Sequence, residues 1–325
     1  MKLTPEQLRA LENLAVSYDG WMQALRAAPQ LDGWLMWKAR NGKEYLYKAR
    51  NRRGQSRSLG PRSPETEALY GEYDARRAGR NAARKRARAT YSAMADTLRI
   101  YRTLRLPVID AMAGRILREA DERGLLGGTL LVVGTNTMAA YEIEARERFA
   151  TGYDSTNDFD LTWAAREPTV RTMRSVSDAP IMDMLKEVDD TFTLNLEKEF
   201  QARNAKAYEV EILIAPSLAA HYPHGEPLRP VPLPEQEWLL MGHPVSHVVL
   251  DRDLVPARIV APDPRWMALH KLWLADKPGR NPLKVDKDRA QGGLLLAAVR
   301  RCMPHYPVDD AFIADVPEML LRYLT

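Results

Sequence analysis

Residues 129–136 read TLLVVGTN and residues 157–161 read NDFDL, and these two segments decide the fold. The run from Thr129 to Val133 is short, apolar and rich in β-branched side chains, which predicts a buried strand that ends at Gly134. The pattern then predicts a helix over 137–149 and a second strand over 158–163. In one sheet, the second strand would lie beside the glycine turn.

Carboxylates recur on one face of two predicted strands. Side chains alternate along a strand, so Asp158 and Asp160 share one face, and Glu209 and Glu211 share a face of a third strand over 208–214. Neighbouring carboxylates repel one another, and a bound Mg²⁺ ion usually compensates their charge. Mg²⁺ takes one or two carboxylates together with substrate phosphates. The glycine turn offers free N–H groups to a phosphate. The sequence therefore predicts metal ligands and a phosphate cradle in one cleft.

The remaining elements follow from helical periodicity and turn signals. Before the core we expect a helix over 5–28, a hairpin at Asn41-Gly42, a loop over 51–64 and helices over 64–104 and 108–123. After it we expect a helix over 178–190, strands over 236–241, 246–250 and 257–260, and helices over 263–276, 284–302 and 309–324. The predicted class is α+β, with a basic hairpin and helical region at 1–125, a core with a small mixed sheet at 126–260 and a helical region at 261–325.

Composition excludes several classes of protein. The 325 residues are 45% hydrophobic and 28% charged, as in ordinary globular proteins, so collagen-like repeats and wholesale disorder are excluded. The single cysteine, Cys302, excludes an intrachain disulfide framework and a multi-cysteine zinc site. No apolar run reaches membrane-spanning length and the N-terminus shows no signal peptide, so we expect a cytoplasmic protein with no membrane partner.

Positive charge is concentrated in one segment. Residues 38–105 hold 19 Lys and Arg against 6 Asp and Glu, although the whole chain is only +4. This asymmetry favours contact with the phosphates of a nucleic acid, while a solvated helix face is the structural alternative. The candidate nucleic-acid-binding residues recur at helical spacing and are Arg76, Arg77, Arg80, Arg84, Lys85, Arg86 and Arg88.

The order and spacing of these motifs resemble the nucleotidyltransferase-fold superfamily, the group related to DNA polymerase β, and more narrowly a bacterial group within it. The resemblance is carried by Gly134-Thr135-Asn136, by the Asp-Phe-Asp of 158–160 and by Val210-Glu211-Ile212-Leu213. Segments 264–272 (PRWMALHKL) and 284–288 (KVDKD) also match, as do short N-terminal matches at 45–47, 59–60 and 63–65. The chain departs from the signature at Thr135, where glycine or serine is usual, and at Glu211, where aspartate is common.

The resemblance implies transfer of a nucleoside monophosphate from an NTP to an acceptor with two Mg²⁺ or Mn²⁺ ions. It assigns catalysis and metal binding to Asp158, Asp160 and Glu211, with Glu209 as the alternative third acid. The implied nucleotide-binding residues are Gly134, Thr135, Asn136, Lys271 and Lys287, with Asp288 beside the last. His270 is expected to be a packed helix residue, and His221, His224, His243 and His247 are not expected to bind zinc.

Three functions stay open on the sequence. The first is transfer to RNA, such as a tRNA 3′ end, with a toxin or defence role and a cognate antitoxin or other partner protein as possibilities. The second is a catalytically silent nucleic-acid-binding protein on the same fold. The third is a protein nucleotidylase whose basic segment docks an acidic partner.

Overall fold

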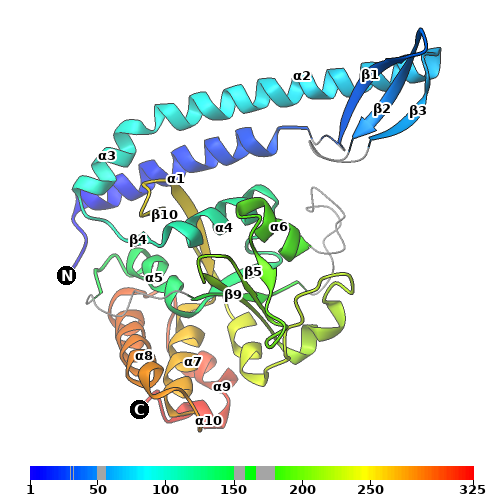
Figure 1. Cartoon of the computed structure of the whole chain (residues 1–325). Coiled ribbons are helices and arrows are strands. Elements are labelled where there is room, and N and C mark those ends of the chain that lie inside the picture. The colour runs from blue at the N-terminus through cyan, green and yellow to red at the C-terminus, as the bar shows by residue number, and fades with distance from the viewer. Residues whose placement is uncertain (30, 32, 50–55, 150–157, 166–179) are drawn as a thin grey trace. The chain divides into compact units, whose positions relative to one another are not determined.

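The computed structural model describes residues 1–29, 31, 33–49, 56–149, 158–165 and 180–325 (Figure 1). The chain forms two compact units. Unit 1 combines Met1–Tyr18 with Asp96–Thr325, and unit 2 is Asp19–Ala95. Within the described ranges, three sheets and a larger set of helices confirm the α+β class. None of the helices in the described ranges is both long and apolar enough to cross a membrane.

Unit 2 contains the basic hairpin that the sequence predicts. Strands β1 (Trp34–Arg40) and β2 (Lys43–Ala49) pair antiparallel around Asn41 and Gly42, whose positive φ angles of 51° and 73° suit a tight hairpin turn. A third strand, β3 (Ser56–Pro61), pairs with β2. The loop predicted over 51–64 is therefore wrong for residues 56–61, and residues 51–55 lie outside the described ranges. Proline near the end of this segment indicated a loop, but an edge strand tolerates it.

A long helix follows this sheet in the chain. Helix α2 (Pro64–Ala93) begins at a capping box, in which the backbone N–H of Thr66 donates to Ser63 Oγ and the Ser63 N–H donates to Thr66 Oγ1. The helix predicted over 64–104 is interrupted at Met94, after which α3 (Ala95–Thr103) follows. Helix α1 (Pro5–Arg26) confirms the helix predicted at the N-terminus.

The largest sheet of unit 1 carries the predicted acids. Its strand order is β5-β6-β9-β8-β7. The three predicted strands are confirmed as β5 (Leu130–Val133), β6 (Asp158–Trp163) and β9 (Glu209–Ile214), and β6 and β9 are parallel. Strands β7 (Thr193–Leu194) and β8 (Gln201–Arg203) were not predicted.

A second sheet of unit 1 has the order β11-β10-β4, formed by β11 (Pro256–Ala261), β10 (Val245–Asp251) and β4 (Val108–Ile109). The strands predicted over 246–250 and 257–260 are thus confirmed. The strand predicted over 236–241 is wrong, because these residues lie mostly in a 3₁₀ helix, η3 (Pro234–Leu240). Its apolar run suits a strand or a buried helix equally, and Pro234 favours a helix start.

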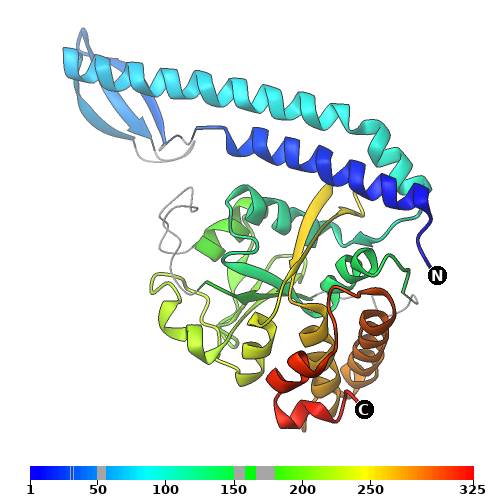
Figure 2. The ribbon, with the colours of Figure 1, turned by 180° about the vertical axis from the view of Figure 1, so that it is seen from behind.

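Helices cover the rest of unit 1 (Figure 2). Helix α4 (Ala111–Glu122) starts later than predicted, because residues 108–109 pair with β10. Helix α5 (Met138–Glu144) is shorter than the predicted 137–149, and Arg146 after it has a positive φ. Helix α6 (Pro180–Val188) lies within the predicted 178–190.

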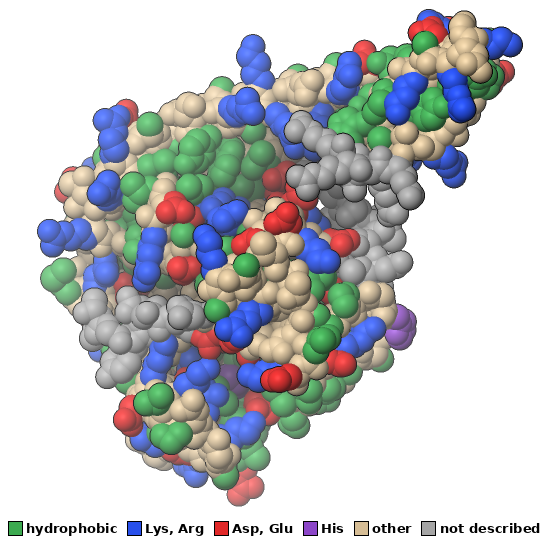
Figure 3. All heavy atoms as spheres, viewed as in Figure 1, with side chains coloured by type: hydrophobic (Ala, Val, Ile, Leu, Met, Phe, Trp, Pro, Cys, Tyr) green, Lys and Arg blue, Asp and Glu red, His purple; other side chains and the backbone are tan. Residues whose placement is uncertain are grey.

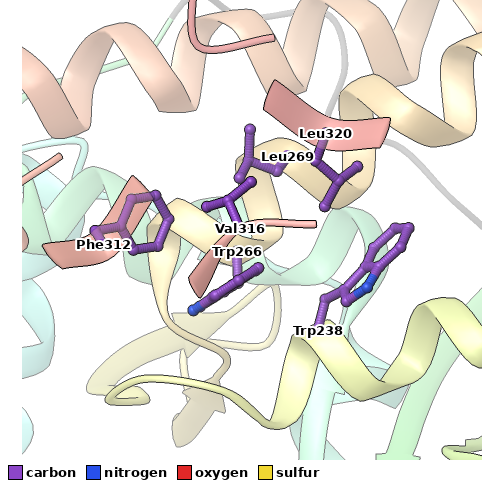
Figure 4. Packing of buried hydrophobic residues seen from close by; sticks show 6 residues of the cluster. All are labelled: Trp238, Trp266, Leu269, Phe312, Val316 and Leu320. Atoms are coloured by element: carbon purple, nitrogen blue, oxygen red, sulfur yellow. The ribbon is translucent and has the colours of Figure 1, made fainter. Parts of the chain in front are cut away.

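The C-terminal helices are α7 (Pro264–Asp276), α8 (Pro282–Cys302), α9 (Asp310–Asp315) and α10 (Glu318–Leu321). The single helix predicted over 309–324 is divided where Pro317 follows Val316. Figure 4 shows the buried cluster that joins α7, α9 and α10 to η3: Trp238, Trp266, Leu269, Phe312, Val316 and Leu320. The rings of Trp266 and Phe312 meet edge to face at 5.2 Å. This packing fixes α7, which carries several side chains of the candidate site.

Candidate active site

Strand register brings the predicted carboxylates together. Asp158 lies opposite Glu209 and Asp160 lies opposite Glu211 in the parallel β6–β9 pair. All four residues are half-buried, and their neighbours along both strands point into the core. The period-2 pattern of the sequence therefore produces two adjacent rows of acids on one face of the sheet.

The turn after β5 is shaped around Asp160. Gly134 has a φ of +72°, and a Cβ placed on it would lie 2.3 Å from Asp160 Oδ2. Only glycine allows this approach, because any side chain would meet the carboxylate. The turn is also tied to β6, since the Asn136 side-chain amide donates to the Asp158 carbonyl at 3.3 Å. Gly134 thus fits its predicted place beside the acids.

The three turn residues do not face one space. Gly134 lines a cavity of about 380 Å³ together with Asp160 and Glu211. Thr135 and Asn136 line a separate cavity of about 360 Å³. Thr135, where glycine or serine was expected, therefore belongs to the wall of the second cavity.

The carboxylates have different electrostatic surroundings. Burial of Asp160, with the nearby charges of Glu211 and Asp158, raises its pKa to about 7 against the opposing effect of Lys271 and Lys284. Burial would also raise the pKa of Asp158, but its contact with Lys284 outweighs this and lowers it. The Lys284 Nζ to Asp158 Oδ2 distance is 2.8 Å. Asp158 is thus paired with a lysine, while at Asp160 burial and the like charges outweigh the effect of the two lysines.

Gln201 on β8 holds the acids of β9 in place. Its side chain is 0% exposed, and its Nε2 donates to Glu211 Oε1 at 2.8 Å and to Glu209 Oε2 at 3.2 Å. Asn195 Nδ2 in turn donates to Gln201 Oε1 at 2.7 Å. Gln201 was not predicted as a site residue, because its strand is only three residues long and shows no alternating pattern.

Cations from the C-terminal helices complete the cavity wall. Lys271, 4% exposed, pairs with Asp288 at 2.9 Å, and Arg280 Nε also donates to Asp288 at 2.9 Å. Lys271, Arg280 and Lys284 line the cavity, as does Lys277, which pairs with Glu235 at 2.5 Å. Lys287 is half-buried, and its pKa is lowered by burial and by Lys271.

Lys284 was not among the predicted site residues. It stands three residues before Lys287 and therefore on the same side of α8, but this spacing does not indicate that either lysine meets Asp158. Of the two predicted lysines, the structure brings Lys271 into the cavity wall, and Lys284 takes the position beside Asp158.

Two carboxylates of the cavity fit a divalent cation. Within the described ranges, no group of three or more His, Cys, Asp and Glu side chains is arranged to hold a metal ion. Asp160 and Glu211 nevertheless share one cavity wall, and their mutual repulsion contributes to the raised pKa of Asp160. Mg²⁺ commonly takes one or two carboxylates and completes its shell with water and substrate phosphates.

A family model described as nucleotidyltransferase matches residues 111–315. The chain belongs to this nucleotidyltransferase family. The matched range contains the glycine turn, the acids of β6 and β9 and the lysines of α7 and α8. No curated protein and no solved structure matches this nucleotidyltransferase.

The predicted basic residues of this nucleotidyltransferase lie on α2 in unit 2. All are exposed except Arg80, which is half-buried, and Arg77 pairs with Asp74 at 2.6 Å. The buried side chains of the helix include Tyr73, Ala83 and Ala87, which fall on one stripe. Lys and Arg side chains are visible along α2 and on the β1–β3 sheet in Figure 3.

Gly134→Ala is expected to reduce nucleotidyl transfer at least a hundredfold. The added methyl group would meet Asp160 Oδ2 and would also strain the backbone at a φ of +72°. Steady-state kcat/KM and Tm of the purified variant check this. Gly128→Ala is the matched control, because its Cβ would meet no atom within 4 Å. A Gly134→Ala protein as active as the Gly128→Ala control would show that the close approach has no function.

Proposed function

We propose that this nucleotidyltransferase moves a nucleoside monophosphate from an NTP to RNA in a reaction that depends on Mg²⁺ or Mn²⁺. The observation that carries the proposal is a single cavity of about 380 Å³ with carboxylates and cations on its wall. This volume lies in the range of ligand pockets. Carboxylates suit a metal–phosphate complex, and cations suit the charge that develops on leaving pyrophosphate.

Each group of side chains has a distinct role in this proposal. Asp160 and Glu211, with Asp158 beside them, would hold the cation, which stabilises charge on the attacking and leaving oxygens when bound. Gln201 keeps the Glu211 carboxylate oriented. Gly134 leaves room for the Asp160 carboxylate at the wall of the cavity. Lys271 and Lys284 bind the triphosphate and neutralise the departing pyrophosphate.

Proton movement is assigned to the acids of β9. The acceptor hydroxyl must lose its proton as its oxygen attacks the α-phosphorus, and Glu211 is the carboxylate placed to accept it. Its bond from Gln201 Nε2 leaves the second carboxylate oxygen available. Asn136 supports the turn through its bond to the Asp158 carbonyl. Lys287, the remaining predicted contact, would add positive charge near Asp158.

Incubation with each α-³²P-labelled NTP, Mg²⁺ or Mn²⁺ and total RNA tests the function. We expect label on RNA with wild type and with Asp286→Asn, whose side chain is 92% exposed, and none with Asp160→Asn. Label on protein would instead support a protein nucleotidylase. Folded protein that binds RNA but transfers no label would support a catalytically silent binding protein. A cytoplasmic location and a toxin or defence role with a partner protein remain predictions.

Removal of charge from α2 is expected to weaken RNA binding. In the triple variant Arg84→Gln/Lys85→Gln/Arg88→Gln, three exposed cations are lost, so the slope of log affinity against log salt should fall by about 2. Fluorescence anisotropy with single-stranded RNA at several salt concentrations measures it. The matched control removes three exposed cations of unit 1, Arg9, Lys186 and Lys198. Equal effects of the two triple variants would contradict a specific role for α2.

A further inference from the structure

Two buried side chains in the wall of the nucleotide cavity carry polar atoms that have no hydrogen-bond partner among the described residues. Gln236 is 2% exposed and its Oε1 is unpartnered, and His270 is 6% exposed with both ring nitrogens unpartnered. Buried polar groups are nearly always hydrogen-bonded, because an unmade bond in the interior is costly. Both side chains line the cavity that also contains Asp160 and Lys271. A bound molecule in this cavity would supply the missing partners.

The local structure explains why these groups face the cavity. His270 and Lys271 stand four and three positions before Leu274, so these side chains lie on one side of α7. All three line the cavity. Gln236 comes from η3, which is fixed by Trp238 in the buried cluster. The Trp238 ring also meets the His270 imidazole edge to face at 6.3 Å. Both polar side chains are therefore held on packed elements rather than on loops.

The character of this wall suits a neutral, planar, polar group. Burial, with the charge of Lys271, lowers the pKa of His270 to about 3, so the imidazole is neutral near pH 7 and offers one donor and one acceptor. The Gln236 carboxamide likewise carries an acceptor and donors. Apolar side chains, Phe200, Leu213, Leu233 and Leu274, line the same cavity. A nucleobase, which has polar edges and apolar faces, fits this combination of polar and apolar side chains. The cations and carboxylates of the same cavity suit the triphosphate of a nucleotide and its metal ion.

We propose that Gln236 and His270 bind the base of the incoming nucleotide and select adenine. A Gln carboxamide complements the adenine amino group and a neighbouring ring nitrogen through its acceptor and its donor. His270 supplies a further hydrogen bond from its neutral imidazole. The inference rests on the proposed function, because it takes the cavity to be the NTP site.

Binding of α,β-methylene triphosphates of adenosine, guanosine, cytidine and uridine tests it, because these analogues bind without transfer. Isothermal titration in Mg²⁺ with full-length protein should show at least tenfold tighter binding of the adenosine analogue. In Gln236→Met and in His270→Phe, that affinity should fall about tenfold and the four analogues should approach equal affinity. Tm should be unchanged or raised in both variants, because an unpartnered polar group is removed.

The matched control is Gln23→Met, the same change at an exposed residue of unit 2, which should leave all four affinities unchanged. Wild type that binds the four analogues equally would overturn the adenine selection alone. Variants that keep the wild-type preference would also overturn it. Wild type that binds no analogue would overturn the proposed function as well. A lower Tm with unchanged selectivity would show a purely structural role for the two side chains.

Discussion

Asp160→Asn is expected to abolish nucleotidyl transfer, by a thousandfold or more, and yet to stabilise the folded protein at pH 8. In the proposed reaction the carboxylate would hold the metal–nucleotide complex, and an amide carries no charge for that purpose. In the free protein the same charge is unfavourable. Burial and the charges of Glu211 and Asp158 raise the pKa of Asp160 to about 7.

The gain in stability from Asp160→Asn should depend on pH in a defined direction. An unfolded aspartate loses its proton near pH 4, while folded Asp160 keeps its proton until about pH 7. Between these values the folded state binds the extra proton, so this residue's contribution to wild-type stability falls as pH rises. The Asn variant does not lose stability in this way. Its free energy of unfolding relative to wild type should therefore increase between pH 4 and pH 8, and the difference at pH 8 should be on the order of 2–4 kcal/mol.

Urea unfolding of wild type, Asp160→Asn and Asp286→Asn at pH 5 and pH 8 measures this effect. Asp286 is an exposed carboxylate, so its amide variant controls for the loss of one negative charge. Transfer assays on the same samples give the activity. An Asp160→Asn protein that is less stable than wild type at pH 8 would show that the carboxylates do not repel one another as the structure indicates.

Asp288→Asn is expected to lower the free energy of unfolding by about 3–5 kcal/mol. Lys271 is 4% exposed and its ammonium group pairs with Asp288 at 2.9 Å. Burial alone would raise the pKa of Asp288, but Lys271 and Arg280 together lower it. Loss of the carboxylate leaves the Lys271 charge buried without its partner, which costs far more than loss of a surface ion pair.

Chemical denaturation of Asp288→Asn beside Asp286→Asn checks this prediction, and the control should change stability by less than about 0.5 kcal/mol. The double variant Lys271→Met/Asp288→Leu should recover much of the lost stability, because neither buried charge remains. Its nucleotide binding should nevertheless stay weaker than that of wild type, because the Lys271 ammonium is absent. Equal stability of the two single variants would mean that the Lys271–Asp288 pair is not buried in solution.

The centre of the site could be predicted from the sequence because its signals are local. A glycine after an apolar run and acids at every second position are readable within ten residues, and the structure pairs Asp160 with Glu211 in register. The strand predicted over 236–241 was wrong for the same local reason, since a short apolar run does not distinguish a strand from a helix.

The partners of these acids could not be predicted, because they depend on contacts between distant segments. Lys284 reaches Asp158 across 126 positions of the chain, and no periodicity links the two. Gln201 lies on a strand too short to show a pattern. Gln236 and His270 look like ordinary packed residues until the cavity between their elements is known.

Unit 2 is inserted into the sequence of unit 1, between Tyr18 and Asp96. The two ends of unit 2 lie side by side, with the Trp21 and Tyr91 rings 5.0 Å apart. Unit 1 needs the residues before the interruption, because Tyr18 donates to Asp121 at 2.8 Å in its core. A fragment that begins at residue 96 would lose that bond. Excision of the intervening segment with a short bridging loop would retain it, so the basic module can be removed or exchanged as a cassette while the catalytic scaffold stays whole.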